Sequence, residues 1–290
     1  MSEFEYFTPR RLGEAVSLLR HYGKKAALLA GGTDFMLRVE RRVATPGVVV
    51  DLKNIPDLKG IGTSREGLRI GALALMEEIA SAPAVRKRYG LLASAAGVVG
   101  SIQTRNRATL GGNLCNASPA ADTPPALIAL AAAVRVSSGK RLREVPIEDF
   151  FLGPGKTCLA SGEIVKEIFI PSPARRSAGS FQRSTRTAMD IALVNCAVFL
   201  SLDSRGEVIK DIRIALGAVA PTPLRVQSAE EALRGKKGDL EDIEQAAERA
   251  VASASPIDDV RASAHYRREM VRVLTRRAVV EALQQAKGEI

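Results

Sequence analysis

The sequence predicts an α+β protein, in which a two-part region precedes a C-terminal domain of three antiparallel strands plus helices. First, short apolar runs alternate with helical segments over residues 1–173, as in sheets that helices cover. Second, three strand-like segments follow residue 180, and helical periodicity fills the rest of the chain. Third, Pro171 and Pro173 interrupt any regular element between these regions. We therefore expect three parts, at residues 1–60, 61–173 and 174–290.

The first part is expected to contain one helix and two buried strands. Thr8 can cap a helix and Pro9 suits its first position, so a helix is predicted over residues 8–22, with Gly23 as its end. The apolar residues of this segment recur at the spacing of one helix face: Leu12, Ala15, Val16 and Leu19. The apolar runs 26–30 and 48–52 are predicted strands.

The second part repeats this plan with more elements. Strands are predicted over residues 68–75, 134–136 and 164–170, and helices over residues 76–80 and 84–99. Another helix is expected to begin near Pro124, where Asp122 can cap it. The glycine-rich stretch 105–113 is predicted to be a loop.

The C-terminal part has a different order of elements. After a basic linker at 172–180, the predicted strands are 181–183, 191–202 and 208–219, and a hairpin turn at 203–206 joins the last two. The predicted helices are 228–235, 239–254 and 259–287. In the last helix Arg268, Arg272 and Arg276 share one face. Its apolar stripe is predicted to be Tyr266, Met270, Val273 and Leu274.

Composition excludes several classes of protein. Three scattered cysteines, at positions 115, 158 and 196, cannot staple a secreted scaffold, and they form no CxxC pair. With only two histidines, a zinc centre or a Ser-His-Asp hydrolase is not expected. We predict no metal site, no membrane span and no signal peptide, and therefore a cytoplasmic location.

The positive charge leaves a nucleic-acid partner open. Lys and Arg number 42 against 32 Asp and Glu, a net charge of +10. Such an excess is compatible with a basic nucleic-acid-binding module. The acidic residues are interspersed, however, and the basic stretch 261–277 fits a solvated or partner-facing helix side equally well. We therefore expect no nucleic acid.

Two glycine pairs are the most informative local features. Gly31-Gly32 and Gly111-Gly112 each precede a small polar side chain. Paired glycines let a backbone approach a ligand closely, and consecutive N–H groups form an anion site. Either pair could instead be a tight turn, since neither matches GxGxxG or the P-loop pattern. If the pairs bind phosphate, valine at Gly32 or Gly111 is expected to fill the phosphate space in a folded chain.

Five segments together carry a family resemblance. They are AGGTDF, RNRATLGGNLCNASPAADTPP, AMDIALVNCAVFL, GAVAPTPLRV and ASAHYRREMVRVLTRRAV, in that order. The chain thereby resembles, over essentially its whole length, the FAD-binding medium subunits of the molybdenum hydroxylases, which include carbon monoxide dehydrogenase and xanthine dehydrogenase. The resemblance implies a PCMH-type, vanillyl-alcohol-oxidase-like FAD region followed by a flavoprotein C-terminal domain.

The resemblance also implies which residues bind FAD. The first loop would line the pyrophosphate with Ala30, Gly31, Gly32, Thr33 and Asp34. Leu28 and Leu29 would pass beside the cofactor, and Phe35 is a further cofactor-binding candidate. The second loop would lie against the phosphates and the flavin: Thr109, Leu110, Gly111, Gly112, Asn113 and Ser118. Asp122 falls where the family places an acidic residue on the sugar–adenine part.

Some positions depart from the family pattern. Animal members carry a Lys before the DIA segment, and here Arg183 could supply that charge or could be a surface residue. The aromatic residue that some members place near the flavin is missing from Gly97–Gly100, and Gln103 is a polar candidate beside the ring. The cysteine-rich insertion of the 4-hydroxybenzoyl-CoA reductase branch is absent.

The resemblance implies an electron-transfer role. A molybdopterin-containing large subunit would transform the substrate, a small subunit with [2Fe-2S] clusters would relay electrons, and FAD on this chain would exchange them with NAD, a quinone or oxygen. No catalytic side chain is expected here, because the flavin performs the redox chemistry. The basic stretches 175–186 and 261–277 are candidate docking surfaces. A stand-alone flavin-dependent oxidoreductase of the same fold is the alternative.

Overall fold

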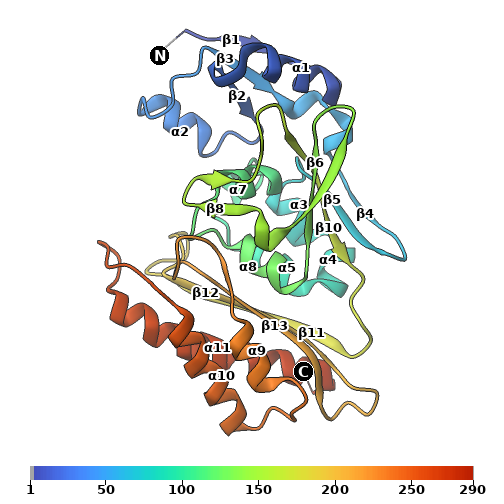
Figure 1. Ribbon diagram of the computed structural model, residues 1–290, viewed down its shortest axis with the longest axis vertical. Coiled ribbons are helices and arrows are strands. Elements are labelled where there is room, and N and C mark those ends of the chain that lie inside the picture. The colour runs from blue at the N-terminus through green and yellow to red at the C-terminus, as the bar shows by residue number, and fades with distance from the viewer. Residues whose placement is uncertain (1–2, 290) are drawn as a thin grey trace.

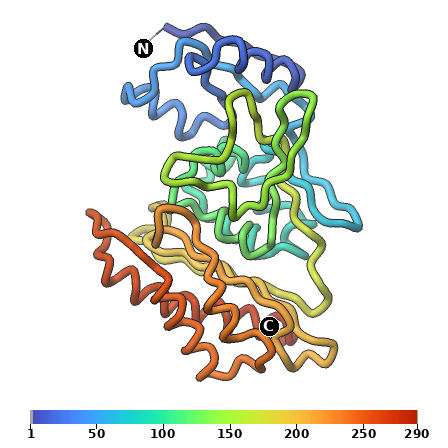
Figure 2. Tube along the Cα trace, viewed as in Figure 1, coloured from blue at the N-terminus to red at the C-terminus, as the bar shows by residue number. Residues whose placement is uncertain are grey.

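The computed structural model describes residues 3–289 as three parts stacked along the long axis of the molecule. The chain begins at one end of the stack, passes through the middle part and finishes at the other end (Figures 1 and 2). Each part has its own cluster of buried apolar side chains. The predicted α+β class is confirmed, whereas the limits at residues 60 and 173 stay predictions.

The N-terminal part is a small parallel sheet with one helix packed on it. The strands lie in the order β1 (Glu5–Phe7), β3 (Val48–Asp51), β2 (Ala26–Leu29). Helix α1 (Leu12–Tyr22) buries Ala15, Val16 and Leu19 against the sheet, and Gly23 ends it with a φ of 53°. A short helix, α2 (Phe35–Glu40), follows the first glycine pair.

Helix α1 begins four residues later than predicted. Thr8 and Pro9 lie outside it, and the N-cap is Arg11. The reason is the carboxylate of Glu14, which accepts the backbone N–H groups of Arg10 and Arg11 at 3.0 and 3.3 Å. This side chain satisfies donors at the start of the helix, as Thr8 was expected to do.

The middle part is a five-stranded antiparallel sheet with helices on one side. The strands lie in the order β4 (Ile61–Thr63), β5 (Gly67–Gly71), β10 (Ile164–Pro171), β6 (Ala133–Ser137), β7 (Leu142–Pro146). A two-stranded ribbon of β8 (Phe151–Gly153) and β9 (Lys156–Thr157) lies beside it. The helices are α3 (Met76–Ser81), α4 (Pro83–Arg88), α5 (Gly90–Gly97), α6 (Ile102–Arg105), α7 (Leu110–Asn116) and α8 (Thr123–Ala129).

The loop prediction for residues 105–113 is wrong. Helix α6 ends at Arg105, and helix α7 starts at Leu110, so the second glycine pair lies inside the first turn of α7. Thr109 caps this helix, because its Oγ1 accepts the Gly112 N–H at 3.1 Å. Only residues 106–109 separate the two helices.

The C-terminal part is an antiparallel sheet between two layers of helices. Its order is β11 (Ser177–Ser184), β12 (Val194–Leu202), β13 (Ile209–Gly217), β14 (Leu224–Arg225). The predicted three strands are present, with β14 as a short fourth strand, and β11 begins inside the predicted linker. The helices are α9 (Gln227–Leu233), α10 (Leu240–Ser253) and α11 (Ala264–Lys287).

Alternate side chains of β12 pack against different layers, the helices α10 and α11 on one face and the middle part on the other. Val194, Cys196 and Val198 belong to the cluster under α10 and α11. Ala197 points to the opposite face and belongs to the core of the middle part, where α8 packs on β12 and β13. A strand buried on both faces explains the nearly continuous apolar run in the sequence. The C-terminal sheet therefore shares a core with the middle part.

The basic face of α11 is largely paired with acidic residues. Arg272 forms ion pairs with Glu248 and Glu269, and Arg276 forms one with Glu244 at 3.0 Å. The predicted apolar stripe is only partly right, since Leu274 is buried but Tyr266 is 43% exposed. Besides Leu274, the buried stripe runs through positions that were not predicted: Arg267, Val271, Thr275, Ala278, Val279, Ala282 and Leu283.

Candidate functional site

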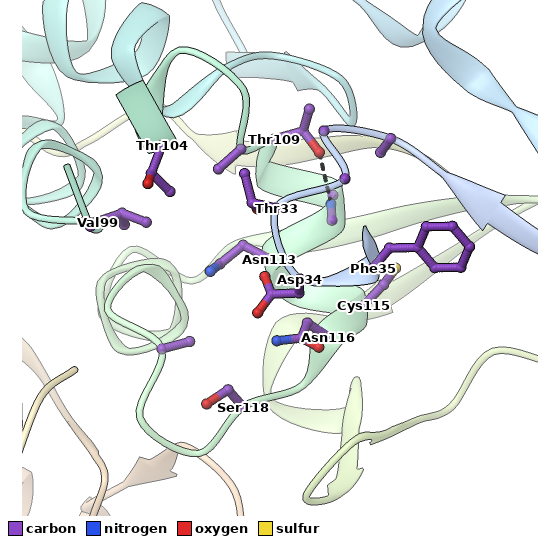
Figure 3. A pocket seen from close by; sticks show the side chains of 18 of the residues that line it. Thr33, Asp34, Phe35, Val99, Thr104, Thr109, Asn113, Cys115, Asn116 and Ser118 are labelled. Atoms are coloured by element: carbon purple, nitrogen blue, oxygen red, sulfur yellow. Dashed lines mark hydrogen bonds between the residues drawn. The ribbon is translucent and has the colours of Figure 1, made fainter. Parts of the chain in front are cut away.

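A cleft of about 530 Å³ lies where the three parts meet. Its walls come mainly from segments 28–38, 99–104, 108–122, 159–165 and 183–191, with Leu52, Ala72 and Leu73 as further lining residues. Figure 3 shows Thr33 and Asp34 of the first stretch beside Thr109 and Asn113 of the third. The volume is in the usual range for small-molecule sites. The cleft is therefore the main candidate for a cofactor site.

The first glycine loop presents free backbone donors to the cleft. Within residues 3–289, the N–H groups of residues 31–35 have no backbone or side-chain acceptor. Gly32 adopts a φ of +80°, which only glycine accepts readily. The Gly32 carbonyl accepts the Met36 N–H at 3.0 Å, so the loop turns directly into α2. Consecutive unpaired amides of this kind form an anion-binding site.

Gly31 allows the two glycine segments to touch. A Cβ at Gly31 would overlap the carbonyl oxygen of Arg107, so any side chain there would push the segments apart. On the other side of the contact, a Cβ at Gly112 would lie 3.9 Å from the Ala30 Cβ and 2.8 Å from the Thr109 Oγ1. The glycines thus bring the first loop against the start of α7.

The second glycine pair does not expose its amides, contrary to the sequence prediction. Gly111 donates to the Ala72 carbonyl at 2.8 Å, and Gly112 donates to Thr109. The space beside Gly111 is filled by Ala72, whose Cβ and carbonyl oxygen would each lie 2.8 Å from an added Cβ. Gly111 is therefore needed to pack α7 against the chain after β5. Valine at Gly111 would disturb folding rather than fill a phosphate space.

Asn113 is the polar side chain that this segment contributes to the cleft. Its Oδ1 accepts the hydroxyl of Thr123 at 2.6 Å, which fixes the orientation of the amide. The Nδ2 group then remains as a donor beside Asp34 (Figure 3). The polar groups that α7 offers to the cleft are thus side chains, Asn113 and Asn116, rather than the glycine amides.

A buried polar cluster forms the end of the cleft nearest the C-terminal part. The Asp122 carboxylate accepts the Asn195 amide at 3.0 Å and lies 3.2 Å from the Arg183 Nε. Burial raises the pKa of Asp122 to about 6, although Arg183 and the Asn195 hydrogen bond act in the opposite direction. Asp122 precedes α8 as predicted, but its side chain caps no N–H group there.

Arg183 belongs to the wall of the cleft, and its guanidinium is directed at protein groups. Besides Asp122, it donates to the Val98 carbonyl at 2.9 Å and to the Asp190 carbonyl. The side chain therefore links β11 to two loops that line the cleft. The alternative that Arg183 is a surface residue is wrong, because its side chain is only 10% exposed.

Comparisons with known proteins agree over the whole chain. Residues 2–173 match the FAD binding domain in molybdopterin dehydrogenase, and residues 179–282 match the CO dehydrogenase flavoprotein C-terminal domain. The chain belongs to this family of FAD-binding subunits. FAD is the cofactor of the matched domain, and the family consists of oxidoreductase flavoproteins.

Two curated relatives cover nearly the full length. The carbon monoxide dehydrogenase medium chain of Hydrogenophaga pseudoflava is 36% identical over 95% of this chain and 96% of its own. The putative xanthine dehydrogenase FAD-binding subunit of Escherichia coli (strain K12) is 32% identical over 98% of both chains.

Solved structures of the family superpose closely. The Hydrogenophaga pseudoflava carbon monoxide dehydrogenase that lacks the Mo-pyranopterin moiety matches with a TM-score of 0.94 over 98% of both chains, at 36% identity. Quinoline 2-oxidoreductase from Pseudomonas putida 86 matches with a TM-score of 0.92 over 98% of both chains, at 31% identity.

Most of the residues predicted for the cofactor site line the cleft. They are Leu28, Ala30, Gly31, Gly32, Thr33, Asp34, Phe35, Thr109, Gly111, Gly112, Asn113, Ser118, Asp122 and Arg183. Leu29 and Leu110 do not line it, because each is a buried core side chain. Gln103 is exposed on α6 and lies outside the cleft lining. For all of these residues, contact with FAD stays a prediction.

Several residues that line the cleft were not predicted from the sequence. Val99 and Gly100 line the cleft from the connection between α5 and α6, and Thr104 lines it from α6. Within residues 159–165, Leu159 and Glu163 line it from the turn before β10, and Ile164 and Val165 from the start of that strand. Segment 189–191, between β11 and β12, contributes Met189 and Ile191. The AMDIALVNCAVFL motif was a usable signal for this last segment. Residues 159–165 form a turn and the start of β10, and they carry no local pattern that sets them apart from an ordinary connection between strands.

Two absences concern the described residues alone. No group of three or more His, Cys, Asp or Glu side chains within residues 3–289 is placed to hold a metal ion. No helix in the same range is long and apolar enough to cross a membrane.

Proposed function

We propose that this chain is the FAD-carrying electron-transfer subunit of a molybdenum-containing hydroxylase or dehydrogenase. In this role it passes electrons between a [2Fe-2S] small subunit and an external acceptor. The observation that carries the proposal is the row of unpaired N–H groups at residues 31–35 in the wall of the cleft. A dinucleotide with two negatively charged phosphates is the ligand that such a row accommodates.

The cleft has suitable groups at both ends for FAD. The amides of residues 31–35 would hold the pyrophosphate, with the Asn113 amide as a further donor. Charge-assisted hydrogen bonds of this kind contribute roughly 1.5–3 kcal/mol each. The end formed by Asp122 and Arg183 offers a fixed pattern of polar groups, which suits the hydrogen-bonding groups of the cofactor beyond its phosphates.

The residues that line the cleft indicate what the chain itself contributes and what the cofactor contributes. When bound, FAD supplies the capacity to accept and release one or two electrons. The chain binds the cofactor through backbone amides and orients it against segment 99–104 and segment 189–191. The buried Asp122–Arg183 pair keeps the local charge balanced at one end of the cleft.

The proposed partners are a molybdopterin-containing large subunit and a [2Fe-2S] small subunit. Support comes from relatives that are named as medium chains or subunits of such enzymes. Arg261 and Arg267 pair with Asp259, and Arg186 pairs with Asp190, so both candidate docking stretches carry less free charge than the sequence indicates. The external acceptor would be NAD, a quinone or oxygen, and the assembly would act in the cytoplasm.

The test is purification of the tagged full chain from its native cell. We expect one FAD per chain, together with molybdenum, iron and two further polypeptides. A chain that carries FAD but purifies alone would favour the stand-alone flavin-dependent oxidoreductase. A colourless chain whose association with DNA or RNA falls steeply with salt would overturn the flavin function and favour the nucleic-acid-binding alternative.

A further inference from the structure

Arg267 is a buried arginine that connects three separate stretches of the chain, two through backbone carbonyls and one through a carboxylate. It lies in the first turns of α11 and is only 4% exposed. Its Nη1 donates to the carbonyls of Leu193 and Ala218 at 2.6 and 3.3 Å, and its Nη2 donates to the Asp259 carboxylate at 2.9 Å. Arg267 does not line the cleft. A planar guanidinium can hold several acceptors in a fixed geometry.

The contact with Leu193 fixes one wall of the cleft. Leu193 closes the loop between β11 and β12, and its N–H donates to the Ser184 carbonyl at 2.8 Å. Earlier in this loop, Met189 and Ile191 line the cleft, and Arg183 donates to the intervening Asp190 carbonyl. One arginine thus holds the loop at Asp190, and Arg267 holds it at Leu193. The side chains that face the cleft lie just before the second of these points.

The contact with Ala218 extends to a second wall. Ala218 has a φ of 64°, a left-handed conformation that residues other than glycine seldom adopt. In this conformation its N–H donates to the Pro119 carbonyl at 2.7 Å, while its own carbonyl accepts from Arg267. Pro119 lies between Ser118 and Ala120, which both line the cleft. Arg267 therefore acts on both walls through backbone groups.

Asp259 is the third partner of the Arg267 guanidinium. Its Oδ1 accepts the N–H groups of Arg261 and Ala262 at 2.8 and 3.1 Å, as well as the Nη2 of Arg267. The carboxylate compensates the buried charge of the guanidinium, which would otherwise be costly. Its other contacts anchor the guanidinium to the loop before α11.

We propose that Arg267 is a positioning residue for the FAD site. Its guanidinium sets the spacing between the loop that carries Met189 and Ile191 and the loop that carries Ser118 and Ala120. The inference rests on the proposed function, because it assumes that a flavin binds between these two loops. Loss of the guanidinium releases both loops while the amides of residues 31–35 remain intact.

The test compares three variants of the full chain after FAD has been removed. Arg267→Met removes the guanidinium, and Arg267→Lys keeps the charge but not the planar group. Arg268→Met is the matched control, since Arg268 is the next residue and is exposed. FAD affinity is measured by quenching of flavin fluorescence, and the setting of the bound ring by visible circular dichroism. Hydrogen exchange of the FAD-free chain reports loop mobility.

We expect Arg267→Met to weaken FAD binding at least tenfold and to change the dichroism of the residual bound flavin. Arg267→Lys should fall between Met and the native chain, and Arg268→Met should stay within twofold of the native chain. Exchange should accelerate at residues 118–122 and 189–193, with the rest of the sheet unchanged. If the Met variant does not fold, the same three measurements on the Lys variant test the proposal.

Three results would overturn the proposal. They are native affinity in Arg267→Met, native affinity in Arg267→Lys, and weakened affinity accompanied by faster exchange throughout the C-terminal sheet. The last result would show a general loss of core stability. Failure of the native chain itself to take up FAD would instead refute the proposed function, so the two failures are distinguishable.

Discussion

Replacement of Asp122 by asparagine is predicted to remove a pH dependence of stability that the buried carboxylate creates. Asp122 is 6% exposed, and burial raises its pKa from 3.8 to about 6 in the folded chain. The folded state therefore binds the carboxyl proton more tightly than the unfolded state does. The contribution to stability is greatest below pH 4, declines as the pH rises towards 6, and is constant above that.

The size of this effect follows from the difference between the two pKa values. A difference of about 2 units at about 1.4 kcal/mol per unit corresponds to about 3 kcal/mol of folding free energy in total, of which about 2.5 kcal/mol is lost between pH 4 and pH 7. The neighbouring Arg183 and Asn195 already oppose the shift, so their effect is included. Asparagine keeps the size of the side chain and cannot titrate.

The assay is urea unfolding of the FAD-free native and Asp122→Asn chains at several pH values from 4 to 8. The stability of the native chain minus that of the variant should fall by about 2.5 kcal/mol across this interval, with most of the change between pH 4 and 6. Other titrating groups are common to both chains and cancel in the difference. A difference that stays constant with pH would refute the assignment of a raised pKa to Asp122.

Further predictions concern single positions. Gly32→Ala should lower stability by about 1–2 kcal/mol, because a φ of +80° disfavours alanine, and should weaken FAD binding in a fluorescence titration. Gly13→Ala in α1 should instead raise the free energy of unfolding measured in urea by up to about 1 kcal/mol, since no atom lies within 4 Å of the added Cβ. Gly111→Val should fail to give soluble folded protein, and a folded variant that merely lacks FAD would contradict the packing against Ala72. Glu230→Gln should cost about 3 kcal/mol in urea unfolding, because Glu230 is buried and holds both Arg225 and the Ile214 N–H; a cost under about 1 kcal/mol would contradict this.

Hydrophobic periodicity was sufficient to predict most of the elements. Strand β12 and helix α10 lie within about three residues of their predicted limits. The strand is a nearly continuous apolar run, and the helix has apolar residues at helical spacing. The start of α1 was misplaced because the Glu14 carboxylate, rather than Thr8, satisfies the first amides. Such competition between two capping groups depends on side-chain geometry that a sequence pattern does not contain.

The roles of the two glycine pairs depend on contacts between segments that are distant in the sequence. Both pairs look alike in sequence, yet only the loop at Gly31-Gly32 has unpaired amides in the structure. Gly111 is needed because Ala72 approaches it, and this contact joins segments about forty residues apart. The role of Arg267 was equally hidden, since its partners at Leu193 and Ala218 are backbone carbonyls far away in sequence.

The central claim is that the amides of residues 31–35 hold the FAD pyrophosphate. Amide chemical shifts of the full, isotopically labelled chain, recorded during titration with FAD, test this claim most directly. The largest shifts are predicted at Gly31–Phe35, and the Gly111 and Gly112 amides, which donate within the protein, should change much less. Large shifts at Gly111 and Gly112 with unchanged resonances at Gly31–Phe35 would contradict the account.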